Sequence, residues 1–119
     1  MPALTDVLKR SLSRGQEIRV TVKGRKSGHT ISHPVWFVFE DETIYLLPVH
    51  GSDTQWYKNA RKNPSIRIKA GGAESEFNAV PITDPVQVSS VVEKFRGKYG
   101  DSGVKLYSKL DVAVVARAR

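Results

Sequence analysis

The residues of this chain best suited to bind a charged ligand lie in one short stretch, Gly24-Arg25-Lys26-Ser27-Gly28. Its two glycines free the backbone for a tight turn and let another group approach its N–H donors. Arg25, Lys26 and Ser27 add cationic and hydroxyl donors within the same few residues. This combination predicts a cradle for an anion. A short basic loop between two strands is also a common way to make a soluble hairpin, and short motifs often match by chance.

The charge balance of the whole chain points in the same direction as this loop. The sequence has 19 Lys and Arg against 12 Asp and Glu, a formal net charge of +7. Such an excess favours anionic partners: a nucleic acid, a phosphorylated cofactor or an acidic membrane face. Solubility alone also accounts for part of it. The net charge therefore indicates an anionic ligand or partner but does not identify it.

Length and composition exclude several classes of protein. A chain of 119 residues is expected to form one domain, residues 1–119. It has no cysteine, which rules out disulfides, thiolate metal sites and cysteine nucleophiles. We expect no signal peptide and no membrane span, and therefore a cytoplasmic protein. His29 and His33 have a metal-ligand spacing only on a helix, and the residues between them read as loop and strand, so we expect no metal site.

The first half of the chain is expected to hold a helix and three strands. Apolar residues at helical spacing predict a helix over residues 4–13. Residues 18–23 alternate apolar and polar, which predicts a half-buried strand running into the glycine loop. Residues 32–40 are β-branched or aromatic on both faces, as is typical of a central strand with both sides covered. A turn at Asp41-Glu42 leads to a strand over residues 43–49.

Two further helices begin at recognisable start signals. Ser52 and Gln55 have the spacing of a capping box, in which each side chain bonds the backbone N–H of the other residue, and this helix is expected to end by Asn63. Asp84-Pro85 predicts an N-cap followed by proline at the first helical position. An apolar stripe then continues to a helix end before Gly100.

Three strands are expected in the second half of the chain. Gly71-Gly72 predicts a hairpin turn between strands over residues 66–70 and 74–82. The apolar positions of the second of these strands change phase, which suggests a bulge near Ala79. A last strand is expected over residues 111–116.

These elements predict a mainly β fold: a six-stranded antiparallel β-barrel with three to four short helices, some of which plug it. Tight hairpins favour antiparallel over parallel pairing, and a small sheet protects its edges by curling. The chain has neither a Gly-x-Gly-x-x-Gly nor a Gly-x-x-x-x-Gly-Lys-Ser/Thr sequence. The nucleotide-binding α/β folds are therefore disfavoured.

Several stretches together resemble the deazaflavin (F420)-dependent nitroreductase family. They are the glycine loop, Pro34-Val35-Trp36-Phe37, Leu46-Leu47-Pro48-Val49, Trp56-Tyr57-Lys58-Asn59 and Asn63-Pro64. Their order and spacing over about residues 19–70 make the resemblance more specific than the loop alone. It implies the split β-barrel fold of the pyridoxamine-phosphate oxidase-like, FMN-binding flavin reductases.

The resemblance also implies a cofactor site. Residues corresponding to Lys26 and Ser27 help to hold the phosphate-bearing tail of the deazaflavin, and those around Pro34, Pro48 and Val49 line its ring. The candidate cofactor-binding residues are Arg25, Lys26, Ser27, Pro34, Val35, Trp36, Pro48, Val49, Gly51, Trp56 and Asn59. FMN is the alternative cofactor, and relatives with this barrel also hold FAD or haem. Trp56 is more readily explained as a core residue or barrel plug than as a wall near the cofactor.

The reaction implied is hydride transfer from the deazaflavin or flavin to a small organic substrate, which demands no catalytic side chain. Tyr57, Tyr99 or Tyr107 could donate a proton, although tyrosines on helices more often pack. Family members commonly carry an arginine where this chain has Ile31, so tail binding is expected to be weaker or rearranged. The substrate is not transferred from the family, and both a monomer and a homodimer are compatible with it.

Two non-enzymatic alternatives remain open. One is a flavin or deazaflavin carrier. The other is a small basic barrel that binds single-stranded nucleic acid, with Trp36, Phe37, Trp56 and Tyr57 as stacking residues. The second is less favoured because Trp36 and Phe37 are adjacent in a strand and must point to opposite faces.

Overall fold

The computed structural model describes residues 6–15, 17–41 and 43–118, which form three α-helices, one 3-10 turn and seven strands. The elements are α1 (Asp6–Arg14), β1 (Ile18–Lys23), β2 (Thr30–Val35), β3 (Phe37–Glu40), β4 (Thr43–Leu46), η1 (Gly51–Asp53), α2 (Gln55–Lys62), β5 (Ser65–Ala70), β6 (Ala73–Ile82), α3 (Pro85–Val104) and β7 (Ala113–Ala118). None of the helices in these described ranges has the length and apolar character needed to cross a membrane.

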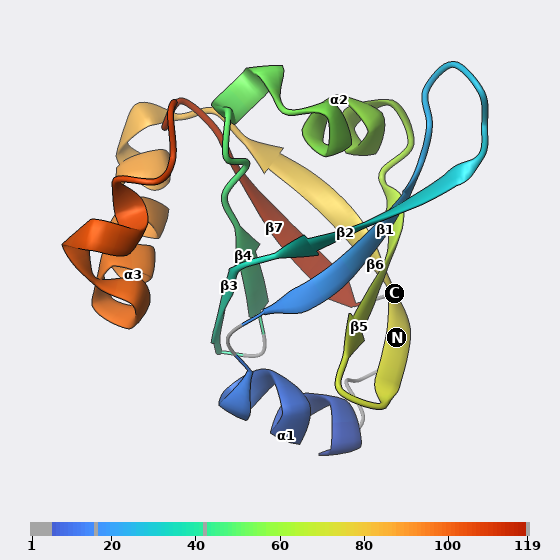
Figure 1. Ribbon diagram of the computed structural model, residues 1–119, viewed down its shortest axis with the longest axis horizontal. Helices are drawn as coiled ribbons and strands as arrows, with labels where there is room; N and C mark the ends of the chain where they lie inside the picture. Colours follow the sequence, from blue (N-terminus) through green and yellow to red (C-terminus); the bar gives the residue numbers. More distant parts are fainter. Residues whose placement is uncertain (1–5, 16, 42, 119) are drawn as a thin grey trace.

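All seven strands belong to one antiparallel sheet in the order β2-β1-β5-β6-β7-β4-β3. The two outermost strands, β2 and β3, are consecutive in the chain and are separated by a single residue, Trp36. A sheet whose opposite edges are one residue apart must curl back on itself, as the crossing strands in Figure 1 show. The fold is therefore the mainly β, curled split barrel that was expected.

The strand count and the position of one strand differ from the prediction. Residues 32–40 were expected to form one central strand, but the chain breaks at Trp36 into β2 and β3, which gives seven strands in place of six. The run is apolar on both faces because Phe37 faces the barrel interior while Val38 packs under α3. Pro34 has no N–H to donate and lies in the edge strand β2, where proline is tolerated.

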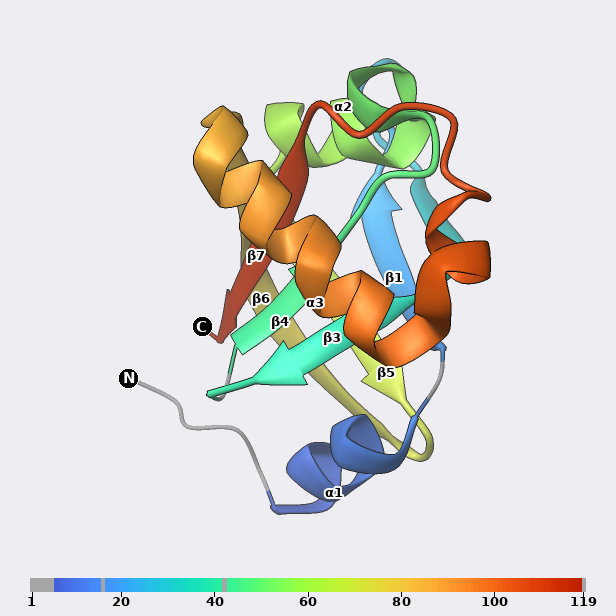
Figure 2. The ribbon, with the colours of Figure 1, turned by 90° about the vertical axis from the view of Figure 1, so that its left-hand side faces the viewer.

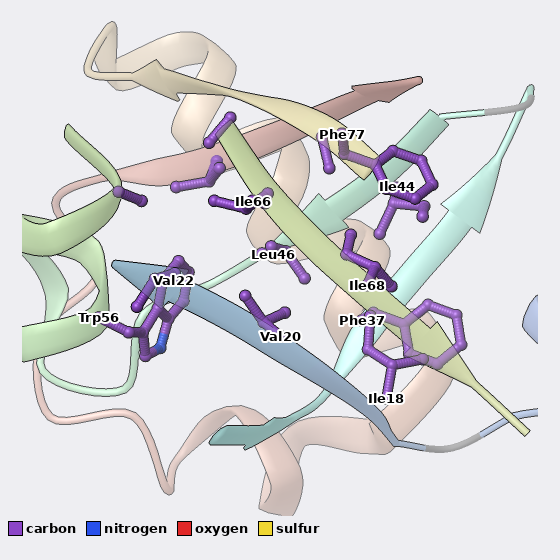
Figure 3. Packing of buried hydrophobic residues seen from close by; sticks show 14 of the residues in the cluster. Ile18, Val20, Val22, Phe37, Ile44, Leu46, Trp56, Ile66, Ile68 and Phe77 are labelled. Carbon is purple, nitrogen blue, oxygen red and sulfur yellow. The ribbon is translucent and has the colours of Figure 1, made fainter. Parts of the chain in front are cut away.

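Alternate residues of β1 and β5 fill the barrel interior, as their periodicity predicted. Val20 and Ile68 are fully buried there and face the side chains of the opposite wall, such as Leu46 (Figure 3). Helices α1 and α2 lie over opposite ends of the barrel in Figure 1. Leu8 and Leu12 of α1, and Trp56, Tyr57 and Ala60 of α2, belong to the same core cluster. The helices therefore plug the barrel as expected.

Helix α3 packs on the outside of the barrel, across β3 and β4 (Figure 2). Its predicted apolar stripe is buried against Val38, Leu47 and Ala113 and consists of Val88, Val91, Val92 and Phe95. The predicted N-cap is present, since an Asp84 carboxylate oxygen accepts a hydrogen bond from the Gln87 backbone N–H at 3.0 Å.

The bulge expected near Ala79 is absent. The register between β6 and β7 runs without interruption from Phe77 to Ile82, and the pairing of β6 with β5 runs without interruption from Ala73 to Asn78. The apolar positions change phase because Phe77 and Ala79 face the interior, whereas Ile82 packs against the α3 cluster on the outer face. The apolar residues change phase at the point where the covered face of the strand changes from the barrel interior to the outer face.

The predicted capping box is also wrong. Thr54, not Ser52, is the N-cap of α2, and no side chain caps the helix. Ser52 lies in the preceding 3-10 turn and bonds to Asp111 instead. The end of α2 at Lys62, with Asn63 as C-cap, is as predicted.

Other element boundaries move by a few residues. The first helix, expected over residues 4–13, spans Asp6–Arg14, and its expected first two residues lie outside the described part of the chain, as does Glu42. The strand expected over residues 43–49 ends at Leu46, so that Pro48 and Val49 belong to a loop. The last strand, Ala113–Ala118, begins two residues late. A break at Gly100, with φ of 78°, interrupts α3 where its first part was expected to end.

Candidate functional site

A cleft of about 330 Å³ opens where the two edges of the sheet meet. Its walls come from the end of β2 with Trp36, the loop after β4, the start of α2 and the residues that follow α3. Residue 17 and residues from 33–36, 47–56 and 106–107, which are far apart in the sequence, thus converge on one space. Most of its lining is apolar or aromatic, and Trp36, Trp56 and Tyr107 contribute rings to it.

Five of the candidate cofactor residues line this cleft: Pro34, Val35, Trp36, Val49 and Trp56. The other six do not line it. Pro48 is buried beside it, and Arg25, Lys26, Ser27, Gly51 and Asn59 lie in the supporting elements. The structure therefore brings most of the expected ring-lining residues together, with the exception of Pro48, and leaves the expected tail-binding residues outside the cleft.

Trp36 is held by α3. Its ring stacks on Tyr99, with centroids 4.3 Å apart and planes 9° from parallel, and meets Tyr107 edge-on at 6.3 Å. The Tyr99 hydroxyl donates to the Phe37 carbonyl oxygen at 2.8 Å and accepts from the Phe37 N–H at 3.0 Å. Lys98 Nζ donates to the same carbonyl at 2.8 Å. These bonds fix the backbone directly after Trp36 and hence this wall of the cleft.

A clasp between residues 48–54 and 106–111 forms the opposite wall. The Ser108 N–H donates to the Val49 carbonyl at 2.9 Å, and Ser108 Oγ lies 2.7 Å from His50 Nδ1. Ser52 donates to the Asp111 carboxylate from its N–H at 3.0 Å and its hydroxyl at 2.6 Å. Val49 and Leu106, one from each side of the clasp, both line the cleft.

Gly51 allows the clasp to close. Its φ is +56°, a conformation that side chains disfavour, and a Cβ atom there would collide with Asp111 Oδ1 and crowd Lys109. Burial alone would raise the pKa of Asp111, but hydrogen bonds from Ser52 and the charge of Lys109 outweigh it, so that this pKa lies below its ordinary value. Gly51 thus lets the two segments of this wall pack together, but does not itself line the cleft.

The glycine loop is a tight turn fastened to α2. Gly28 has a φ of 75°, and its N–H donates to the Gly24 carbonyl at 2.9 Å. Asn59 Oδ1 accepts from the Arg25 backbone N–H at 3.1 Å and from Arg25 Nη1 at 2.8 Å, while Arg25 Nη2 donates to Gln55 Oε1 at 2.9 Å. Asn59 is only 4% exposed, so it is an internal bonding partner and not a solvated surface residue.

The remaining donors of the loop face solvent. Lys26 and Ser27 are exposed, and Ser27 Oγ accepts a hydrogen bond from the His29 N–H at 3.2 Å. Gln55, the loop's partner on α2, is the neighbour of Trp56. The loop therefore lies beyond the α2 end of the cleft.

The described lining of the cleft contains no Lys or Arg. Its ionisable groups are Glu17, His33 and Tyr107. Burial is the main cause that raises the pKa of the Tyr107 hydroxyl well above its ordinary value, with Tyr99 adding to it. Tyr107 is therefore protonated at neutral pH and can donate a hydrogen bond.

The three tyrosines weighed as proton donors have different surroundings. Tyr57 is 1% exposed within the core and does not line the cleft. The Tyr99 hydroxyl is bonded to the Phe37 backbone. Tyr107 alone of the three lies in the lining.

Sequence reasoning missed Glu17, His33, Leu47, Thr54 and Leu106 as lining residues. Thr54 is buried, and its Oγ1 accepts from the His50 N–H at 2.9 Å. A buried threonine just before a helix could have been noticed as an N-cap. Glu17 and Leu106 carry no local signal, because only the long-range closure of the barrel brings them to the cleft.

Solved structures with the same architecture share little sequence with this chain. HutZ, the heme storage protein of Vibrio cholerae, has a TM-score of 0.74 at 14% identity, over 99% of this chain and 92% of that one. An F420-H2 dependent reductase, FDR-A, has a TM-score of 0.68 at 18% identity, over 86% of this chain and 94% of that one. A putative pyridoxamine 5'-phosphate oxidase of Listeria innocua has a TM-score of 0.68 at 14% identity, over 93% and 89% of the two chains.

These likenesses show the split β-barrel fold of the pyridoxamine-phosphate oxidase type. Among curated proteins, no sequence matches the chain significantly. A family model described as "Uncharacterized protein conserved in bacteria (DUF2255)" matches residues 9–118. The chain therefore belongs to the DUF2255 family.

Proposed function

We propose that the cleft binds the ring of a deazaflavin or flavin and that the protein is an oxidoreductase acting on a small organic substrate. One observation carries this proposal: Pro34, Val35, Trp36, Val49 and Trp56, five of the candidate cofactor-binding residues, converge on one cleft. The F420-dependent reductase among the structural neighbours supports the choice of cofactor.

The cleft fits a flat aromatic ring. Its volume of about 330 Å³ falls within the range of small-ligand sites, which are mostly apolar with a few polar groups. Trp36, locked against Tyr99, offers a rigid aromatic surface for stacking. When bound, a reduced deazaflavin or flavin would supply a hydride.

The residues of the chain position the ligand and keep water away. Leu47, Val49 and Trp56 present apolar surface to it. The Tyr107 hydroxyl is protonated at neutral pH, as burial raises its pKa further above an already high ordinary value, and it would donate a hydrogen bond to a ligand oxygen or nitrogen. We propose Lys26 and Ser27 as contacts for an anionic tail leaving the α2 end of the cleft, with Arg25 and Asn59 holding the loop in place.

A bulky substitution inside the cleft tests the ring site. Val49 lines the cleft and is 44% exposed, so Val49→Trp can fill space without disturbing the core. Val86→Trp, on α3 at a residue that is 77% exposed, is the matched control. Binding of F420 and of FMN is measured by the polarisation of flavin or deazaflavin fluorescence. We expect Val49→Trp to weaken binding more than tenfold and Val86→Trp to leave it unchanged. Equal affinities in both variants would contradict the ring site.

The tail contact has its own test. Lys26→Ala should lower the affinity for F420 severalfold, by about 1 kcal/mol, and leave the melting temperature nearly unchanged, since Lys26 is exposed in a turn. Lys62→Ala removes the same charge from the exposed last turn of α2 and serves as control. An unchanged F420 affinity in Lys26→Ala would contradict the tail assignment.

A turnover assay distinguishes an enzyme from a carrier. Reduced F420 is mixed with the protein and an artificial nitroaromatic or quinone acceptor, and its reoxidation is followed by absorbance. An enzyme accelerates reoxidation and loses the effect in Val49→Trp. Tight binding with no acceleration for any acceptor would favour a carrier.

We further propose that a second copy of the chain packs at the mouth of the cleft. The outer edge of β2 has no strand partner among the described residues, and Leu106 beside it is 68% exposed. Light scattering is expected to give a dimer, which Leu106→Glu should dissociate. A monomer at high concentration would contradict this.

A further inference from the structure

A second hollow, of about 250 Å³, adjoins the cleft at the end away from α2. Glu17 and Pro34 line both spaces, so the two lie next to each other at the edge of β2. The second hollow lies on the outer face of β1 and β5 and contains Arg19 and Lys69. The cations that the cleft lacks are therefore found directly beside it.

Sheet register brings the two cations together. Arg19 of β1 and Lys69 of β5 are cross-strand partners, and both are exposed on the outer face of the sheet. Neither has an ion pair or a side-chain hydrogen bond within the described parts of the chain. Like charges directly opposite each other in a sheet repel and destabilise the pairing.

The nearest acids leave this pair largely unneutralised. Glu74 stands opposite Lys69 on β6, but its carboxylate bonds to Arg67 at 3.0 Å. Glu17 is the only acid among the described residues that line the hollow, so two positive charges face one negative charge. The hollow therefore keeps a net positive charge.

We propose that Arg19 and Lys69 form an oxyanion subsite of the cleft, which takes a phosphate group of the ligand bound there. The position of this subsite rests on the proposed function, because the ring in the cleft determines which group reaches it. The phosphate has two possible sources: the cofactor itself, if the phosphate arm of FMN points away from α2 rather than toward Lys26 and Ser27, or a phosphorylated substrate bound beside the ring. A bound phosphate would relieve the repulsion between the two cations.

Comparison of FMN with riboflavin isolates the phosphate, because the two ligands share the same ring. If the cofactor supplies the phosphate, Arg19→Ala and Lys69→Ala should each weaken FMN binding about fivefold and leave riboflavin binding unchanged. Lys23→Ala is the matched control, since Lys23 lies on the same face of β1, is exposed and lines neither space. Glu17→Gln should strengthen FMN binding.

A second measurement detects the subsite without a cofactor phosphate. The 15N-labelled full chain, saturated with riboflavin, is titrated with sodium phosphate against sodium chloride at equal ionic strength. The backbone amides of Arg19 and Lys69 should shift with phosphate alone, and Arg19→Ala should abolish the shift. The titration can also be run on the free protein.

Repeating the titration with FMN bound identifies the source. If the FMN phosphate fills the subsite, added phosphate no longer shifts these amides. If added phosphate still shifts them and Arg19→Ala leaves FMN affinity intact, the subsite serves a separate phosphorylated ligand. Both results support the proposal.

The proposal is overturned if Arg19→Ala and Lys69→Ala behave like Lys23→Ala in both measurements. That failure differs from failure of the proposed function. In the latter, neither riboflavin nor FMN nor F420 binds, while phosphate still shifts the amides of Arg19 and Lys69 in the free protein.

Discussion

Asn59→Ala tests whether Arg25 anchors the glycine loop to α2. The substitution removes the oxygen that accepts from the Arg25 backbone N–H at 3.1 Å and from its Nη1 at 2.8 Å. We assign about 1 kcal/mol to the backbone bond and about 1.5 kcal/mol to the bond from the partly buried charged group. Alanine is the better helix former by about 0.6 kcal/mol, which leaves a net loss of about 2 kcal/mol.

A loss of this size is readily measured. With an unfolding entropy of about 2.1 cal/mol/K per residue, a chain of 119 residues should lose about 8 °C in melting temperature. Circular dichroism during thermal and urea unfolding measures the loss. Lys26→Ala, in the same loop but exposed, is the control and should stay within about 2 °C of the original chain.

A double-mutant cycle assigns the loss to the contact itself. Arg25→Ala and Asn59→Ala should be coupled by about 1 to 2 kcal/mol, since each removes the bond between the two side chains. A coupling below about 0.5 kcal/mol would refute the reasoning, because the two residues would then act independently.

Three further predictions concern the walls of the cleft. Gly51→Ala should lower the free energy of unfolding, measured by urea titration, by about 2 kcal/mol, because a residue with a Cβ is strained at a φ of +56° and this atom collides with Asp111. An unchanged free energy of unfolding would contradict the clasp. Tyr99→Phe keeps the ring on which Trp36 stacks but removes both bonds to the Phe37 backbone, and should cost about 1 to 2 kcal/mol in the same assay. Asp111→Asn should be less stable than the original chain at pH 6. Because the pKa of Asp111 is lowered in the folded protein, the ionised carboxylate stabilises the fold above the ordinary pKa of 3.8, and this stabilisation is lost as the pH falls through the folded pKa. The melting temperatures of the two chains should therefore converge below about pH 4. A difference that stays constant with pH would argue against this linkage.

Local pattern was sufficient to predict most of the fold. The alternation in residues 18–23 predicted β1, and Asp84-Pro85 predicted the start of α3, because these signals depend only on the period of burial or on one turn of backbone. The antiparallel curled sheet followed from the tight hairpins. Whether residues 1–119 form one domain stays a prediction.

The break at Trp36 could not be predicted from local pattern. Residues 32–40 read as one strand because burial by α3 and burial inside the barrel produce the same apolar sequence. Likewise, Ser52 and Gln55 have the spacing of a capping box, but Asp111, almost sixty residues away in the chain, competes successfully for the serine. In both cases a long-range contact decides between two locally acceptable structures.

The candidate site was predicted only in part for the same reason. The candidate residues that line the cleft are consecutive in the chain or lie at the ends of clearly predicted helices and strands, so the family resemblance could assign them to the site. Arg25 was expected to bind a ligand, yet its backbone N–H and both terminal guanidinium nitrogens donate to Asn59 and Gln55. The Arg19 and Lys69 pair depends on sheet register, which a single sequence does not display.

The order of strands also constrains how the protein can fold. The hairpins β1–β2, β3–β4 and β5–β6 join neighbours in the chain and can form early, whereas β7 inserts between β6 and β4 and bonds both. Until β7 is in place, no strand pairing links β3 and β4 to the other strands, and Trp36 is the short covalent link between the two groups. On a ribosome, the chain would therefore emerge with its cleft unformed, and ligand binding would have to wait for the residues of β7.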